Sequence, residues 1–127
     1  MSQIKVKTLT REIVALANEF GLSAVPEYRM PDGTRIDIAI LDSGLKLLAI
    51  ELETSFKWFP QRVLYNVLKA HRAGFPELWV VTPFRNVKPG WVLNYAEELG
   101  VRLKVLPPEE LEKEIAEIRA SSLLSST

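Results

Sequence analysis

Hydrophobic residues recur along the chain at two spacings, and the change of spacing separates expected helices from expected strands. Between residues 8 and 20 they recur every three or four positions, which places four of them on one helix face: Leu9, Ile13, Leu16 and Phe20. Thr8 stands where a helix N-cap is expected, and Gly21 follows as a helix-ending residue. The first predicted element is therefore an amphipathic helix.

Three strands are predicted next, separated by turns that contain glycine. The strands and turns alternate over residues 24–30, 31–33, 35–41, 42–44 and 45–53. Side chains alternate across a strand, so Ile36, Ile38 and Ile40 are expected on one face of the second strand and Asp37 on the other. The hairpin that follows is expected to bring Asp37 beside Glu51 of the third strand.

The third strand carries two glutamates on an otherwise apolar face. Glu51 and Glu53 are two residues apart, so both are expected to project from the face that also carries Leu47 and Ala49. Carboxylates in such surroundings are costly unless a cation or hydrogen-bond donors compensate them. Together with Asp37 they form an expected site for a divalent cation, which prefers oxygen ligands. On spacing alone, an edge strand with Glu51 and Glu53 facing solvent or a lysine explains the pattern equally well.

The second half of the chain predicts helices that alternate with strands. Pro60 opens a helix that runs to about Arg72, with His71, the sole histidine, on its core face. The elements expected after it are a buried strand at 78–81, a helix near 89–99, a strand at 101–106 and a helix at 108–120. A stripe of apolar residues on the last helix is expected to dock on the domain or on a second subunit: Leu111, Ile115 and Ile118. The order predicts one α/β domain over residues 1–127.

Composition and charge narrow the classes of function. The 127 residues include no cysteine, which excludes disulfides, thiolate chemistry and Cys-based zinc sites. No apolar run approaches the roughly 20 residues that span a bilayer, and no signal peptide is recognisable, so a cytoplasmic location is expected. Residues 1–107 carry 14 basic and 11 acidic residues, a net charge of +3, whereas 108–127 carry a net charge of −3. The mildly basic body is compatible with DNA as a partner.

Two stretches of the chain resemble the core of the PD-(D/E)xK nuclease superfamily, which includes type II restriction endonucleases, archaeal Holliday-junction resolvases and RecB-like nucleases. The stretches are Arg35-x-Asp37 and, after a turn, Ala49-Ile50-Glu51-Leu52-Glu53. The resemblance covers about residues 8–82 and implies a restriction-endonuclease-like core, a central mixed β-sheet flanked by helices in the order α-β-β-β-α-β-α-β-α. It also implies that Asp37 and Glu51 bind Mg²⁺, for which Mn²⁺ is expected to substitute.

Two further positions match the same superfamily. Gln61 and Tyr65 resemble the QxxxY motif of RecB-like members. A helical wheel places Lys69 and Arg72 on the same face, and such a polar, cationic face suits contact with a phosphate backbone. Resolvase-like members carry a glutamate on the first helix, which Glu12 matches, with Glu19 on nearly the same flank. The residues that the resemblance implies for catalysis are Asp37, Glu51, Glu53, Glu12 and Gln61, the four acids among them also binding metal.

The chain departs from the superfamily pattern at two positions. Glu53 stands where the motif has lysine, so the ammonium that orients the attacking water is missing and a further metal ligand is gained. Lys57 or Lys69 is the expected source of a displaced ammonium. Ile36 stands where the signature has proline. The expected DNA contacts are Arg35, Lys57, Tyr65, Lys69 and Arg72.

The function expected from these residues is metal-dependent hydrolysis of DNA phosphodiester bonds by an endonuclease that recognises a DNA structure. A domain of this size is expected to act as a homodimer or to take its specificity from a protein partner. Two alternatives stay open: a catalytically silent nuclease-fold domain that binds DNA or a protein, and an unrelated small α/β interaction module.

Four further side chains each have two open interpretations. Trp58 and Phe59 are expected either to stack on splayed bases or to anchor a loop against the core. Arg85 and Lys88 are expected either to extend a basic rim or to be solvated surface charges.

Overall fold

The computed structural model describes residues 5–84 and 90–125. Helices and strands follow one another in the predicted order. A 3₁₀ turn at Pro108–Glu110 precedes the last helix, and the other elements are α1 (Val6–Glu19), β1 (Ser23–Arg29), β2 (Arg35–Asp42), β3 (Leu45–Leu52), α2 (Phe59–Ala73), β4 (Glu77–Val81), α3 (Val92–Glu98), β5 (Arg102–Leu106) and α4 (Leu111–Ser125).

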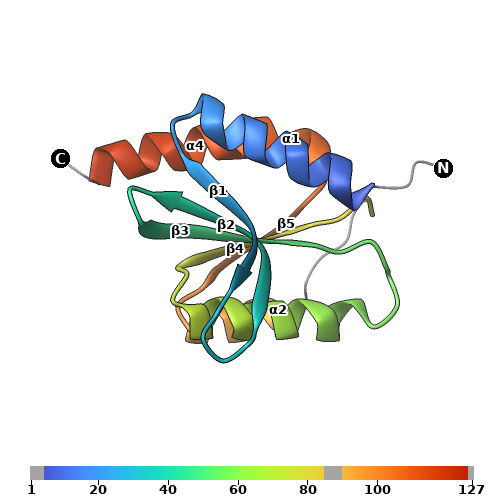
Figure 1. Ribbon diagram of the computed structural model, residues 1–127. Helices are drawn as coiled ribbons and strands as arrows, with labels where there is room; N and C mark the ends of the chain where they lie inside the picture. Colours follow the sequence, from blue (N-terminus) through green and yellow to red (C-terminus); the bar gives the residue numbers. More distant parts are fainter. Residues whose placement is uncertain (1–4, 85–89, 126–127) are drawn as a thin grey trace.

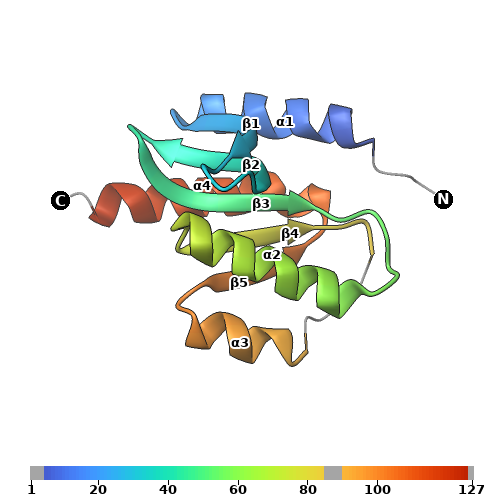
Figure 2. The same cartoon turned by 60° about the horizontal axis from the view of Figure 1, so that its bottom comes forward.

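One mixed sheet of five strands, in the order β1-β2-β3-β4-β5, forms the middle layer of the molecule. Strands β1, β2 and β3 pair antiparallel, and β3, β4 and β5 pair parallel. Helices α1 and α4 lie over one face and α2 over the other, and α3 follows on the α2 side beside β5 (Figures 1 and 2). This mixed sheet flanked by helices confirms the predicted fold class and is compatible with a nuclease-like core.

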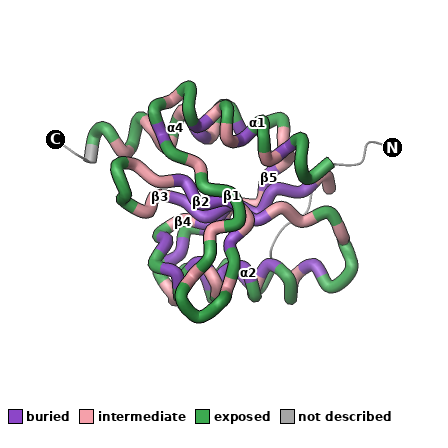
Figure 3. Tube along the Cα trace, in the orientation of Figure 1, coloured by how far each residue is buried: buried purple, intermediate pink, exposed green. Residues whose placement is uncertain are grey.

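Two clusters of buried side chains lie on opposite faces of the sheet, and buried segments run through the centre of the trace (Figure 3). On the α1 side, Leu9 and Ile13 pack with Leu111 and Ile115 of α4 against the sheet, so the apolar stripe of the last helix docks on its own domain. On the α2 side, a second cluster includes Phe59, Val63, Val67, Ala70 and Ala73. Among the described residues, no helix is both long and apolar enough to cross a bilayer.

Helix α2 is fixed over the sheet at its C-terminal end. Gly74 ends the helix with a φ of +83°, a left-handed conformation that glycine adopts without a Cβ clash. The Lys46 ammonium of β3 donates a hydrogen bond to the carbonyl of Ala73, the last residue of the helix, at 2.7 Å. This contact ties α2 to the strand that carries the candidate acids.

Several local predictions were wrong. Helix α1 begins at Val6 with Lys5 as its N-cap, so Thr8 lies inside the helix, where it does not cap the end. Ile36 packs in the cluster on the α2 side, whereas Ile38 and Ile40 pack on the α1 side, so the three do not share a face. His71 is exposed, because the buried face of α2 runs through Val67, Ala70 and Ala73.

The register of β2 against β3 explains a further difference. Ile40 pairs with Leu48 but Leu41 pairs with Lys46, a shift that leaves Leu47 as an extra residue. Leu47 consequently packs with the α1-side cluster, away from Ala49. Leu47 and Ala49 therefore lie on opposite faces of the sheet, although strict alternation along β3 predicts that they share one.

Candidate metal centre

Asp37 and Glu51 face each other across the β2–β3 ladder, near the start of one strand and the end of the other. Ile38 pairs with Ile50, and Asp37 and Glu51 are the next residues beyond that pair. On its other side, Glu51 pairs with Val80 of the parallel strand β4. The predicted proximity of Asp37 and Glu51 is thus confirmed, at the carboxyl ends of β3 and β4, where α/β sheets commonly bind ligands.

Asp37 is fixed by a backbone contact from the neighbouring strand. The Leu52 amide donates a hydrogen bond to Asp37 Oδ2 at 2.8 Å. This bond orients the half-buried carboxylate toward the end of β3 and leaves Oδ1 for a further contact.

Glu51 is the most deeply buried charged side chain of this site, with 4% of its side chain exposed. Its Oε2 atom lies 3.1 Å from the Lys69 ammonium, a charged contact that is poorly aligned for a hydrogen bond, and no other described residue donates to it. Burial, reinforced by the charge of Asp37, raises the pKa of Glu51 to about 8 against the opposing effect of Lys69. Burial therefore favours the protonated form of Glu51 at neutral pH when no metal is bound.

Lys69 reaches Glu51 from the third turn of α2. Its ammonium donates a hydrogen bond to the Arg35 carbonyl at 3.0 Å and lies 5.2 Å from the centre of the Tyr65 ring. With 12% of the side chain exposed, the cation is largely shielded from water. Lys69 is thereby held beside the carboxylates and has little freedom to move.

Glu53 makes separate contacts with two residues of α2. Asn66 Nδ2 donates a hydrogen bond to Glu53 Oε2 at 3.0 Å, and Arg62 lies 3.5 Å from Glu53 Oε1. Arg62 also donates from Nε to the Lys57 carbonyl at 3.0 Å, which ties the loop before α2 to the helix. Both oxygens of Glu53 are thus engaged by the protein itself.

These side chains line a hollow of about 340 Å³. The hollow brings together five of the predicted site residues, namely Asp37, Glu51, Glu53, Tyr65 and Lys69. Thr54, Ser55, Arg62 and Asn66 also contribute to its wall. It combines three carboxylates with two cations, an amide and a phenol.

Gln61 lies outside this hollow, contrary to the prediction from the QxxxY resemblance. It is exposed on α2, and the face that lines the hollow runs through Arg62, Tyr65, Asn66 and Lys69. Helix α2 is rotated about its own axis relative to the prediction, because Asn66 belongs to its buried face, and this rotation turns Gln61 away from the hollow. Sequence analysis missed Asn66, although a polar residue inside the apolar run of α2 was a signal for it.

Glu12 is also placed elsewhere. It lines a hollow between α1 and the start of α4, together with Glu19, Glu109 and Glu112. The face of α1 that borders Asp37 carries Lys7, Thr10 and Arg11 instead. Glu12 is therefore not positioned to bind a metal beside Asp37 and Glu51.

Three of the expected DNA contacts do not line the hollow. Lys57 is exposed in the preceding loop, and Arg72 is 3.4 Å from Asp32 in the β1–β2 turn. Arg35 pairs with Glu27 at 3.0 Å. The proposed extension of the basic rim by Arg85 and Lys88 lies outside the described residues.

The aromatic residues before α2 have two different environments. Phe59 is buried and stacks against Phe56, which anchors the loop. Trp58 is 64% exposed and has a φ of +57°, a left-handed conformation that is unfavourable for a bulky side chain. Of the two, Trp58 is available to a ligand.

The donor set fits one divalent cation bound by Asp37 and Glu51. Apart from the Lys69 ammonium, no described residue offers a donor to the buried Glu51 Oε2 atom, and a raised carboxyl pKa is expected where a cation normally neutralises a pair of acids. Within residues 5–84 and 90–125, however, no three acidic or histidine side chains converge closely enough to form a cluster of metal ligands. Further ligands would have to be water or substrate oxygens, as is usual for Mg²⁺.

The structure of Pyrococcus furiosus SfsA in complex with Ca²⁺ resembles this fold. The TM-score is 0.52 at 18% sequence identity, over 82% of this chain and 58% of that chain. This chain thus spans less than two thirds of SfsA, and at this identity the similarity shows the fold alone. No family model and no curated protein sequence matches the chain.

Proposed function

We propose that this protein is a metal-dependent DNA endonuclease that binds Mg²⁺, or Mn²⁺ in its place, with Asp37 and Glu51. The observation that carries the proposal is the buried Glu51 carboxyl group, which lies beside a second carboxylate and has an oxygen whose one close partner among the described residues is the Lys69 ammonium. Structural acids are normally satisfied when buried, whereas acids that serve a metal or a reaction have perturbed pKa values. The Ca²⁺ bound by the similarly folded SfsA is in keeping with a cation site on this fold.

Each residue of the hollow has a role that follows from its contacts. When bound, Mg²⁺ polarises the scissile phosphate and activates a water molecule. Asp37, oriented by the Leu52 amide, and Glu51 hold the cation. Lys69 supplies the ammonium missing from position 53 and offsets negative charge that develops on the phosphate during hydrolysis.

Glu53 acts through its neighbours and not as a ligand. It fixes Asn66 and Arg62, and Arg62 is 47% exposed at the rim of the hollow, where it is accessible to a DNA phosphate. Tyr65, which is 60% exposed beside Lys69, offers a second contact. The homodimer and the protein partner expected from the size of the domain stay predictions.

A cleavage assay tests the proposed function. Supercoiled, linear and branched DNA are incubated with the wild type and the Asp37→Asn variant in Mg²⁺, Mn²⁺ or EDTA. Glu98→Gln, which changes an exposed residue of α3, is the control. The proposal expects metal-dependent cutting by the wild type and the control, and none by Asp37→Asn. Binding of DNA without cutting, in all metals, would instead support the catalytically silent alternative.

A further inference from the structure

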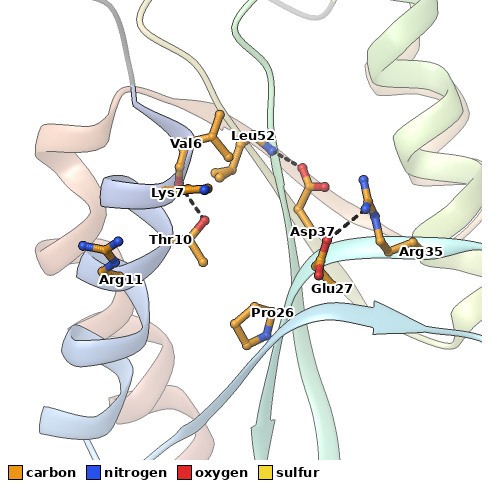
Figure 4. Close-up of a pocket in the computed structure, with 9 residues that line it drawn as sticks. All are labelled: Val6, Lys7, Thr10, Arg11, Pro26, Glu27, Arg35, Asp37 and Leu52. Atoms are coloured by element: carbon orange, nitrogen blue, oxygen red, sulfur yellow. Dashed lines mark hydrogen bonds and ion pairs between the residues drawn. The ribbon is translucent and has the colours of Figure 1, made fainter.

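A second hollow adjoins the metal centre on the side of α1. It has a volume of about 430 Å³ and lies between the first turns of α1 and the β1–β2 hairpin (Figure 4). Asp37 and Leu52 belong to the walls of both hollows. A ligand that extends past Asp37 from the metal centre would therefore enter this space.

The charges around the second hollow favour an anion. Lys7 and Arg11 are four residues apart on α1, are both exposed, and form no ion pair with a residue in the described part of the chain. Arg35 is already paired with Glu27, and the Asp37 carboxylate is turned toward the Leu52 amide (Figure 4). The Lys7 side chain points into the hollow and the Arg11 side chain points to the outer side of α1 (Figure 4), so one uncompensated positive charge stands at the hollow and a second lies on the adjoining surface.

The remaining wall offers apolar surface. Val6, Pro26 and Leu52 contribute side chains without hydrogen-bonding groups, and the Thr10 hydroxyl donates to the Val6 carbonyl at 2.7 Å. Apolar walls with cations at one side suit a ligand that has an uncharged body and a phosphate. The volume lies within the ~300 to 1,000 Å³ range of small-ligand sites, so it fits a nucleotide.

We infer that this hollow binds the nucleotide adjoining the scissile phosphate of a DNA strand, with Lys7 holding the phosphate of that nucleotide and Arg11 adding positive charge on the adjoining surface of α1. The inference rests on the proposed function, because the metal centre places the scissile phosphate at Asp37. It assigns to α1 the role of a phosphate clamp, in place of the metal-binding role expected for Glu12. One strand enters the hollow, while the other strand of a duplex stays outside.

The inference is tested by removing the negative charge from one phosphate of a short DNA strand at a time. Binding of a pentathymidylate is measured by NMR titration in Ca²⁺, with each phosphate replaced in turn by an uncharged methylphosphonate. The proteins compared are the wild type, the Lys7→Gln/Arg11→Gln variant and a Lys113→Gln control on α4, where Lys113 is likewise exposed. The double-mutant cycle separates a local contact from a general change of charge.

The expected result is specific to one phosphate. The phosphate at the metal centre is expected to be the position most sensitive to replacement. In the wild type and the control, a methylphosphonate at the adjoining phosphate also weakens binding, about tenfold or more, as expected for the loss of a charged contact. In the double variant the same replacement changes affinity less than about twofold, and the slope of log K against log salt falls by about 0.7, the value for one phosphate contact on a single strand. Equal sensitivity of the wild type and the double variant at every position would overturn the inference.

The outcomes also separate the inference from the proposed function. If DNA binds through Lys7 and Arg11 as described but no metal supports cleavage, the proposed function is wrong and the subsite stands. If cleavage occurs and the cycle shows no coupling, the subsite is wrong and the proposed function stands. No affinity for DNA at low salt would overturn both.

Discussion

The Lys69 ammonium and the Glu51 carboxyl group lie 3.1 Å apart in surroundings that exclude most water, although Asp37 competes for the same space. Burial of these two groups adds little net stability, because the loss of hydration offsets most of their attraction and raises the pKa of Glu51. A role in metal binding or catalysis therefore explains the arrangement better than a contribution to folding stability does. Its residues come from β2, β3 and α2, so the folded sheet and helix are needed to assemble it.

Lys69 is predicted to be the ammonium that replaces the motif lysine. Lys69→Gln is expected to lower kcat about 100-fold, within the range found when a group that stabilises the transition state is removed. The matched variant Lys57→Gln removes the other candidate ammonium, which is exposed and outside the hollow, and is expected to change kcat less than about twofold. Single-turnover cleavage rates, with circular dichroism as a check of folding, measure both. Equal loss in the two variants would contradict the assignment.

Glu51 is predicted to destabilise the metal-free protein as the pH rises. The folded state keeps the proton up to a pKa of about 8, whereas the unfolded state loses it near 4.5, so the folded state binds more protons in between. The free energy of unfolding therefore decreases from about pH 4.5 to about pH 8, by an amount on the order of a few kcal/mol.

The Glu51→Gln variant removes this titration while keeping the shape of the side chain. Its stability relative to the wild type is expected to increase through the same pH range and to level off above it. Urea unfolding in EDTA at several pH values measures the difference, with Glu98→Gln as the control. A constant difference across that range would show that Glu51 titrates normally.

Glu53 is predicted to be a positioning residue, since Asn66 and Arg62 occupy its two oxygens. Glu53→Gln keeps an oxygen that can accept from Asn66, so the affinity for Mn²⁺ is expected to change less than about threefold, while the apparent KM for DNA rises as Arg62 loses its partner. Asp37→Asn is expected to weaken Mn²⁺ binding by tenfold or more. A loss of affinity in Glu53→Gln as large as in Asp37→Asn would make Glu53 a metal ligand.

Trp58 is predicted to be unfavourable for stability. Its left-handed backbone costs about 1 to 2 kcal/mol, and its side chain is largely exposed. Trp58→Gly is expected to raise the free energy of unfolding by about 1 kcal/mol while weakening the binding of single-stranded DNA, because a surface on which a base can stack is removed. Trp91→Gly is the comparison, since Trp91 is about half exposed and has an ordinary helical backbone. Lower stability of Trp58→Gly would argue against backbone strain at this position.

The sequence alone predicted the order of elements, and it predicted the pairing of Asp37 with Glu51, because both follow from short-range periodicity and one hairpin. It did not predict the rotation of α2, which depends on how Phe59 and Asn66 pack against the sheet. Glu12 was misplaced because the face that α1 turns to Asp37 depends on the α1–α4 contact, a tertiary feature.

The most direct test of the central claim is calorimetric titration of Mn²⁺ at pH 7 into the wild type and the Asp37→Ala/Glu51→Ala variant, in two buffers that differ in ionisation enthalpy. The account predicts one site in the wild type, release of close to one proton on binding because Glu51 holds a proton beforehand, and no binding in the variant. Equal binding by both proteins, or no binding by the wild type even with DNA present, would contradict a metal centre at Asp37 and Glu51.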